Sequence, residues 1–150
     1  MINIEKMNIA VIGLGYVGLP LAIEFGKKYN VVGFDMDESR VKELHSGFDR
    51  TNELNESDLS IINRIKITTS QEDIIDSDVY IVTVPTPVDK NNKPNLEPLI
   101  SASETVGSLL NKNNIIVYES TVFPGCTEEI CVPILEQKSG LVFNLDFFCG

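Results

Sequence analysis

The sequence lacks the features that mark membrane-spanning, nucleic-acid-binding and secreted proteins. No apolar run approaches the roughly 20 residues that a membrane span needs. Lys and Arg number only 12 against 22 Asp and Glu, and the net charge of −10 argues against nucleic acid or an anionic membrane surface as a partner, because both select a basic face. The N-terminal stretch, MINIEKMN, also lacks the basic and then apolar pattern of a signal peptide.

Cysteine is scarce, and histidine is scarcer still. The three cysteines, Cys126, Cys131 and Cys149, have no CxxC spacing, which indicates free thiols in a reducing compartment rather than a disulfide framework or a zinc site. We interpret the aspartates within 73–78 as turn and cap residues, because no second cluster of metal ligands accompanies them. The single histidine, His45, falls late in a charged helical pattern and is expected at the surface. These scarcities predict a cytoplasmic protein without a metal site.

The residues that are present form the pattern of one globular domain. The chain has 150 residues, of which 43% are hydrophobic and 23% charged, and it is long enough to bury a core. Strand patterns are expected at residues 9–12, 30–35, 65–68, 80–84, 115–118, 141–143 and 147–149. Helical patterns are expected at residues 16–28, 38–45, 57–62, 96–110 and 127–138, with a restart near Pro133 in the last, and a turn or short helix at 70–75. This alternation predicts an α/β fold: a Rossmann-like, doubly wound and mainly parallel sheet with helices on both faces.

The most informative stretch is residues 8–21, NIAVIGLGYVGLPL, in which an apolar strand meets GxGxxG and passes into a helical pattern. Gly13 would let the chain turn sharply off the strand, Gly15 would let the backbone approach a ligand, and Gly18 would let the helix pack closely on the sheet. The N–H groups at the helix start, together with the helix dipole, would then bind the pyrophosphate of a dinucleotide. GxGxxG alone is weak evidence, so other parts of the chain must support it.

Asp35 gives independent support, because it lies 35 − 15 = 20 residues beyond Gly15 at the end of the second expected strand. A carboxylate there can accept hydrogen bonds from the adenosine ribose and would repel a 2′-phosphate, which favours NAD over NADP. The alternative is that Asp35 only begins a turn and caps the next helix. Arg40, on the first turn of that helix, could face the adenosine or be an ordinary exposed arginine.

Two further loops follow expected strands and should meet the glycine turn at one edge. They are Pro85-Thr86-Pro87 and Ser120-Thr121, and ligands of doubly wound sheets bind at the carboxyl ends of the strands. Their backbone groups and the hydroxyls of Thr86 and Thr121 could hydrogen-bond the nicotinamide end of the cofactor. The alternative is ordinary turn chemistry, since Thr-Pro and Ser-Thr are common in loops.

Four motifs in this order resemble those of nucleotide-sugar 6-dehydrogenases, the family of UDP-glucose and GDP-mannose dehydrogenases. The motifs are GLGYVGLPLA, VVGFDMDESRV, YIVTVPTPVD and YESTVFPG, and the resemblance covers essentially the whole chain. The narrower likeness is to bacterial members that oxidise UDP-N-acetylglucosamine or UDP-N-acetylgalactosamine to the uronic acid. It rests on VPTPVD with Pro94-Asn95-Leu96, and on ESTVFPG with Glu128-Glu129 and Val132-Pro133.

The resemblance implies NAD as cofactor and a role for particular residues. The expected cofactor-binding residues are Gly13, Gly15, Tyr16, Val17, Gly18, Asp35, Arg40, Pro85, Thr86, Ser120 and Thr121. Of these, Thr121 would also lie near the reacting centre and assist catalysis. Cys126, Cys131 and Cys149 do not match the motif of the family's nucleophilic cysteine, and Cys126 is expected to have a packing role.

The reaction that the resemblance implies is a four-electron oxidation of the C6 alcohol of a UDP-N-acetylhexosamine by two NAD, in bacterial surface polysaccharide biosynthesis. The family's aromatic-Ser-Pro-Glu motif, its lysine and asparagine, its nucleophilic cysteine, the central helix of its homodimer and its UDP-sugar-binding domain are not found in these 150 residues. We therefore expect residues 1–150 to be an NAD-binding domain that binds the cofactor and does not turn over alone.

Two alternatives remain open at this point. A β-hydroxyacid-type dehydrogenase would have a similar first domain, but it predicts a substrate-binding glycine motif near residue 120, where this chain has ESTVFPG. A stand-alone NAD-binding or sensing module would also fit, because no complete catalytic set is present.

Overall fold

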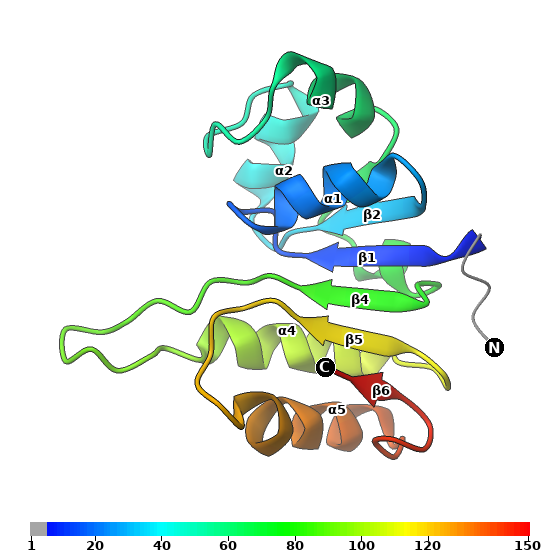
Figure 1. Cartoon of the computed structure of the whole chain (residues 1–150), viewed down its shortest axis with the longest axis vertical. Helices are drawn as coiled ribbons and strands as arrows, with labels where there is room; N and C mark the ends of the chain where they lie inside the picture. The colour runs from blue at the N-terminus through cyan, green and yellow to red at the C-terminus, as the bar shows by residue number, and fades with distance from the viewer. Residues whose placement is uncertain (1–5) are drawn as a thin grey trace.

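The computed structural model describes residues 6–150, with the side chains of residues 56 and 59 excepted. One six-stranded sheet runs through the molecule, with every paired strand parallel to its neighbour (Figure 1). Its strand order is β3-β2-β1-β4-β5-β6, which is the order of a doubly wound dinucleotide-binding fold. The strands are β1 (Asn8–Ile12), β2 (Asn30–Phe34), β3 (Lys66–Thr68), β4 (Val79–Val82), β5 (Ile115–Tyr118) and β6 (Phe148–Cys149).

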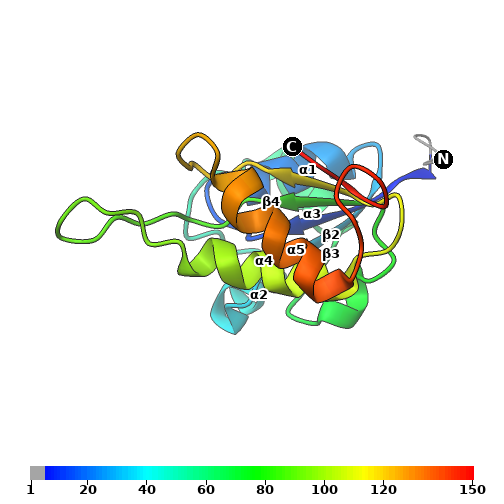
Figure 2. The same ribbon diagram turned by 90° about the horizontal axis from the view of Figure 1, so that it is seen from below.

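Helices connect these strands, and the predicted fold class is confirmed. They are α1 (Gly18–Gly26), α2 (Glu38–His45), α3 (Glu56–Ile62), the 3₁₀ helix η2 (Gln71–Ile74), α4 (Glu97–Leu109), the π-helix η3 (Thr127–Cys131) and α5 (Val132–Ser139). Figure 2 shows α4 and α5 together along one side of the sheet. The carboxyl ends of β1, β2, β4 and β5 meet at one edge, where the loops that follow them form the site.

The core has two parts because the central strands are buried on both faces. In β1, Ile9 and Val11 pack in a cluster with residues of α1, α2 and α3, whereas Ala10 and Ile12 pack in a second cluster with residues of α4 and α5. Successive side chains of a strand point to opposite faces, so a strand covered on both sides reads as a continuous apolar run. That run is why β1 could be recognised from sequence.

One predicted strand is wrong, and one predicted break is confirmed. Residues 141–143 form a loop instead of a strand; Asn144 has a φ of 61°, and the Asp146 carboxylate accepts the Val142 N–H at 3.0 Å, so the chain turns here. The helical segment at 127–138 does restart: the π-helix ends at Cys131 and α5 begins at Val132, one residue before Pro133. Proline has no N–H to continue the earlier hydrogen-bond pattern.

Candidate functional site

A cleft of about 780 Å³ opens at the carboxyl edge of the sheet. All but one of the residues predicted to bind the cofactor line it; those that do are Gly13, Gly15, Tyr16, Val17, Asp35, Arg40, Pro85, Thr86, Ser120 and Thr121. The exception, Gly18, is buried beneath the turn at the start of α1. The structure therefore brings together residues that lie up to 108 positions apart (121 − 13) in the sequence.

The glycine turn has the shape that its sequence predicts. Gly13 has a φ of 95°, which L side chains rarely adopt, and its N–H donates to the Phe34 carbonyl at 2.8 Å. A Cβ added to Gly18 would lie 1.7 Å from the Gly13 carbonyl oxygen and 2.4 Å from Thr83 Oγ1, so only glycine fits there. The turn is thus fixed by close contact with β2 and with the loop after β4.

The middle glycine of the motif differs, because it faces open space. A Cβ added to Gly15 would meet no atom of the described residues within 4 Å, although Gly15 lines the cleft. The N-cap of α1, Val17, provides no side-chain hydrogen bond to the first turn of the helix. Open space beside Gly15 and a helix start without a side-chain cap are what a bound pyrophosphate requires, so these residues fit a dinucleotide.

Asp35 ties the second strand to the glycine turn. Its Oδ2 accepts the Leu14 N–H at 2.8 Å, and its Oδ1 accepts the Asp37 N–H at 2.9 Å. Asp35 therefore does begin a turn, but the helix-capping part of the alternative interpretation is wrong, because Asp37 caps α2 by accepting the Ser39 N–H. Each carboxylate oxygen can accept more than one hydrogen bond, so Asp35 still has acceptor capacity for ribose hydroxyls.

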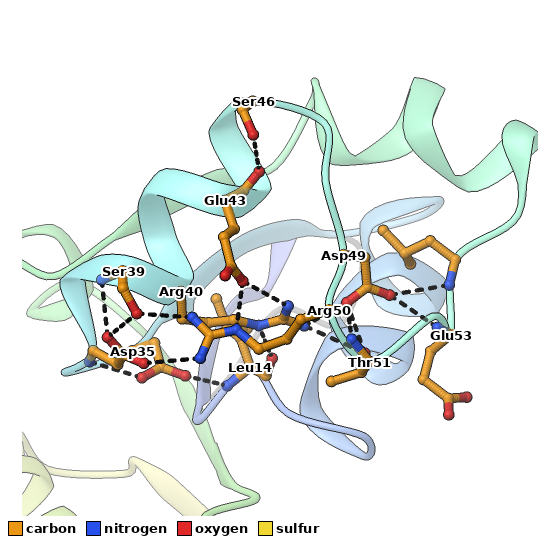
Figure 3. A network of polar contacts seen from close by, with 12 residues as sticks. Leu14, Asp35, Ser39, Arg40, Glu43, Ser46, Asp49, Arg50, Thr51 and Glu53 are labelled. Atoms are coloured by element: carbon orange, nitrogen blue, oxygen red, sulfur yellow. Dashed lines mark hydrogen bonds and ion pairs between the residues drawn. The ribbon is translucent and has the colours of Figure 1, made fainter.

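Arg40 is buried, so it is not an ordinary exposed arginine. Only 4% of the residue is exposed; its Nε donates to the Leu14 carbonyl at 2.8 Å, and its Nη2 donates to Asp49 Oδ1 at 2.7 Å (Figure 3). Among the described residues, Nη1 has no hydrogen-bond partner, and Glu43 Oε2 lies 3.6 Å from it. Arg40 thus joins the glycine turn to the loop after α2, while its contact with adenosine stays a prediction.

Asp49 is the partner that sequence reasoning missed. Burial raises the pKa of its carboxyl, but hydrogen bonds from Thr51 Oγ1, Arg40 and the backbone N–H groups of Glu53 and Thr51 outweigh that effect and lower the pKa to about 2. The carboxylate is therefore charged at any physiological pH and pairs permanently with Arg40. Nothing in its surrounding sequence, GFDRTNE, signals this contact.

The two loops expected at the nicotinamide end hydrogen-bond each other. Thr86 Oγ1 donates to the Thr121 carbonyl at 2.6 Å, and Ser120 Oγ donates to the Val84 carbonyl at 2.7 Å. The Thr86 and Ser120 hydroxyls are therefore engaged in bonds between the two loops and not within either turn. The bonds hold the loops side by side along the cleft, so any direct contact of these residues with a cofactor stays a prediction.

Several residues that line the cleft were not predicted from the sequence. They are Met36, Asp37, Arg50, Thr51, Glu97, Pro98, Ser101, Ala102, Thr105 and Glu119, besides the flanking residues of the turns. Five of them belong to α4, for which the sequence indicated only a helix with an apolar stripe, made of Leu99, Ala102, Val106 and Leu109. Glu119 could have been found, since it directly precedes Ser120 at the end of β5.

The cysteines lie outside the residues that line the cleft. Cys126 and Cys131 are buried, Cys149 is partly buried, and all three are free thiols. Burial raises the pKa of each thiol, that of Cys149 to about 12, which disfavours the reactive thiolate. The packing role predicted for Cys126 is confirmed, because the residue is fully buried in the core.

Residues 6–150 contain no helix that is long and apolar enough to cross a membrane. Over the same range, no group of three or more His, Cys, Asp or Glu side chains could hold a metal ion.

Comparison with known proteins places this site in a family. Residues 7–149 match the family described as "UDP-glucose/GDP-mannose dehydrogenase family, NAD binding domain". A Staphylococcus aureus protein named CapL is 58% identical over 143 residues, which cover 95% of this chain and 34% of that protein. A Salmonella typhi protein named UDP-N-acetyl-D-glucosamine 6-dehydrogenase is 54% identical over 150 residues, which cover 100% of this chain and 35% of that protein.

Solved structures agree with the sequence matches. The UDP-D-ManNAc dehydrogenase of Pyrococcus horikoshii superposes with a TM-score of 0.88 at 35% sequence identity, covering 95% of this chain and 35% of that one. This chain therefore spans about a third of the length of the relatives that it matches.

Proposed function

Because this chain belongs to the UDP-glucose/GDP-mannose dehydrogenase family and corresponds to its NAD-binding domain, we propose that it is the cofactor-binding part of a UDP-N-acetylhexosamine 6-dehydrogenase. The observation that carries the proposal is the glycine turn, with open space at Gly15 and the Asp35 carboxylate beside it. The substrate class follows from the Salmonella typhi relative, whose name states UDP-N-acetyl-D-glucosamine as its substrate.

In this proposal each segment of the cleft holds one part of the cofactor. The N–H groups at the start of α1 bind the pyrophosphate, and Asp35 accepts hydrogen bonds from the adenosine ribose. The loops of Thr86 and Thr121, fixed to each other by their hydrogen bond, orient the nicotinamide over the substrate. When bound, NAD supplies the hydride acceptor, and oxidation of the C6 alcohol to the acid uses two NAD.

The rest of the enzyme lies, in this proposal, outside these 150 residues. The chain covers about 35% of its relatives, which leaves room for a UDP-sugar-binding domain, a central helix that forms a homodimer, and the nucleophilic cysteine with its lysine, asparagine and glutamate. Thr121 would assist the reaction from this chain. The place of action would be the cytoplasm, and the product would serve surface polysaccharide synthesis, as the capsule-related name of CapL suggests.

Calorimetric titration of the purified chain tests the proposal. We expect NAD to bind at least about 10-fold more tightly than NADP, because the 2′-phosphate would meet the Asp35 carboxylate. With NAD and UDP-N-acetylglucosamine or UDP-N-acetylgalactosamine, absorbance at 340 nm should not rise. Absence of NAD binding would refute the proposal that the cleft is a dinucleotide site. Oxidation of the sugar by these 150 residues alone would refute the proposal that essential catalytic residues lie outside them.

A further inference from the structure

Arg50 is a cation at the adenosine end of the cleft, on the turn that follows α2. It lines the cleft, and 42% of its side chain is exposed. The hydrogen bond to Glu43 is the main cause that raises the pKa of Arg50, and the charges of Asp37 and Asp35 add to it. The chain therefore carries, next to its ribose-binding acid, the kind of residue that NADP-dependent proteins use to bind a 2′-phosphate.

Three partners hold the Arg50 guanidinium. Its Nε donates to Glu43 Oε2, its Nη2 donates to Ser39 Oγ at 2.8 Å, and its Nη1 lies 3.4 Å from Asp37 Oδ2 (Figure 3). Every nitrogen of the guanidinium thus faces a partner on α2 or at its N-cap. Two of the three partners are carboxylates, so the positive charge of Arg50 is neutralised locally.

Glu43 is the central member of this group. Its Oε2 accepts from Arg50 and also lies 3.6 Å from Nη1 of the buried Arg40, so it lies between two arginines. Glu43 is not among the residues that line the cleft, but both arginines beside it are: Arg50, which it hydrogen-bonds, and Arg40, whose guanidinium is also held by Leu14 and Asp49.

We propose that Glu43 is a positioning residue for cofactor specificity: by holding Arg50 it denies a 2′-phosphate the cation that would otherwise bind it. Discrimination against NADP then has two sources, the Asp35 carboxylate itself and the neutralised Arg50 beside it. The inference rests on the proposed function, since it concerns the dinucleotide that the cleft binds.

The test is the ratio of the dissociation constants for NADP and NAD, measured by calorimetry on the purified chain. Glu43→Gln removes one of the two carboxylates that neutralise Arg50, and we expect the affinity for NADP relative to NAD to rise about 3- to 10-fold, the range of one exposed charge pair. Adding Arg50→Met to this variant should remove the gain. The gain should also shrink at 1 M salt, because exposed charges are then screened.

Two control variants separate the effect of the Glu43–Arg50 pair from a general effect of removing a charge. Glu24→Gln removes the same charge from an exposed ion pair between Glu24 of α1 and Lys27 at its C-cap. Neither residue lines the cleft, so the ratio of the two dissociation constants should stay unchanged. Arg50→Met in the unaltered chain should also leave the ratio within about twofold, because Arg50 is already occupied; this variant remains informative if Glu43→Gln does not fold.

The outcomes are distinct. A ratio that Glu43→Gln does not change, or a gain that survives Arg50→Met, overturns the inference while NAD binding keeps the proposed function intact. A large loss of NADP affinity in Arg50→Met alone overturns it as well, since Arg50 would then already bind the phosphate. If the unaltered chain binds neither dinucleotide, the proposed function and this inference both fall.

Discussion

Two glycines of one motif are needed for opposite reasons. Gly18 has no room for a side chain, because a Cβ would overlap the Gly13 carbonyl oxygen at 1.7 Å. Gly15 has room that the protein itself does not fill. Gly18 therefore serves the fold, and in the proposed function Gly15 serves the ligand, although both belong to the same GxGxxG motif.

This difference can be measured with one methyl group. Gly18→Ala should lower the free energy of unfolding by about 3 kcal/mol or prevent folding, because backbone must move to accept the Cβ. Gly15→Ala should change stability by less than about 1 kcal/mol and weaken NAD binding at least about 10-fold, since the methyl enters the space of the pyrophosphate. Urea unfolding and calorimetry give the two values. Equal losses of stability in both variants would contradict this division.

Asp49 makes stability depend on pH in the acid range. Its pKa is lowered from 3.8 to about 2 in the folded chain, so its contribution is complete above about pH 5 and disappears as the pH falls through 2. The shift corresponds to about 2 kcal/mol. Asp49→Asn should therefore be less stable by at least about that amount at pH 7, more if the Arg40 charge is left unpaired.

Urea unfolding of Asp49→Asn at several pH values checks this expectation. The difference from the unaltered chain should narrow between pH 5 and pH 2. Asp76→Asn, a change at an exposed residue, serves as the matched control. A difference that stays constant over this range would show that the Asp49 charge does not act as described.

Side-chain roles were predictable where the residue type is dictated by local backbone geometry. Gly13 and Gly18 are such cases. The positive φ of Gly13 and the close backbone contact at Gly18 both require glycine, which can be recognised in the sequence. Asp49 and Arg50 are not, because their partners lie on α2 and their importance arises only when the loop folds back onto it. The sequence alone does not distinguish an exposed arginine from an arginine held in an ion pair.

Among whole elements, α4 and α5 pack closely at a point that has no sequence motif. A Cβ on Gly107 of α4 would lie 2.8 Å from Lys138 Cβ and 3.3 Å from Leu135 Cα of α5. The absence of a side chain there lets the two helix backbones approach each other.

Gly107→Ala tests that approach. Alanine favours a helix by about 1 kcal/mol over glycine, so an increase in stability would be expected if the site were open. We expect instead a net loss of about 1 kcal/mol, because the added Cβ pushes α5 away. Ser108→Ala, at the exposed neighbouring position, should be neutral or slightly stabilising. Thermal unfolding of both variants decides between these outcomes.

Most helices and strands could be predicted because their apolar residues form either a continuous run, where both faces of a strand are buried, or a stripe at helical spacing. The apolar run of β1 and the stripe of α4 are of this kind. Residues 141–143 are also apolar, but they are followed by Asn144 at a φ of 61° and by hydrogen bonds that close a turn, which leaves too little length for a strand. The apolar side chain of Phe143 instead packs on the Phe147 ring, with the ring centroids 5.8 Å apart.

At the scale of the molecule, the location of the site followed from a rule about sheet topology rather than from any single residue. Parallel strands joined by right-handed crossovers with GxGxxG after the first strand form this type of sheet, so the edge that carries the cleft could be predicted. The contribution of α4 to the cleft could not be predicted, since it depends on which residues of the helix face the cleft once α4 has packed on the sheet. Topology thus predicted the location of the cleft but only some of the residues that line it.

The central place of β1 has a consequence for synthesis. β1 pairs with β2 on one side and with β4 on the other, and β4 begins at Val79. During translation β1 therefore has only one of its two neighbours while residues 35–78 are synthesised, because its second neighbour is made later. The cleft is complete only after Thr121 has been made, so a dinucleotide that spans the whole cleft would stabilise the domain only after β5 and the loop that follows it have been synthesised.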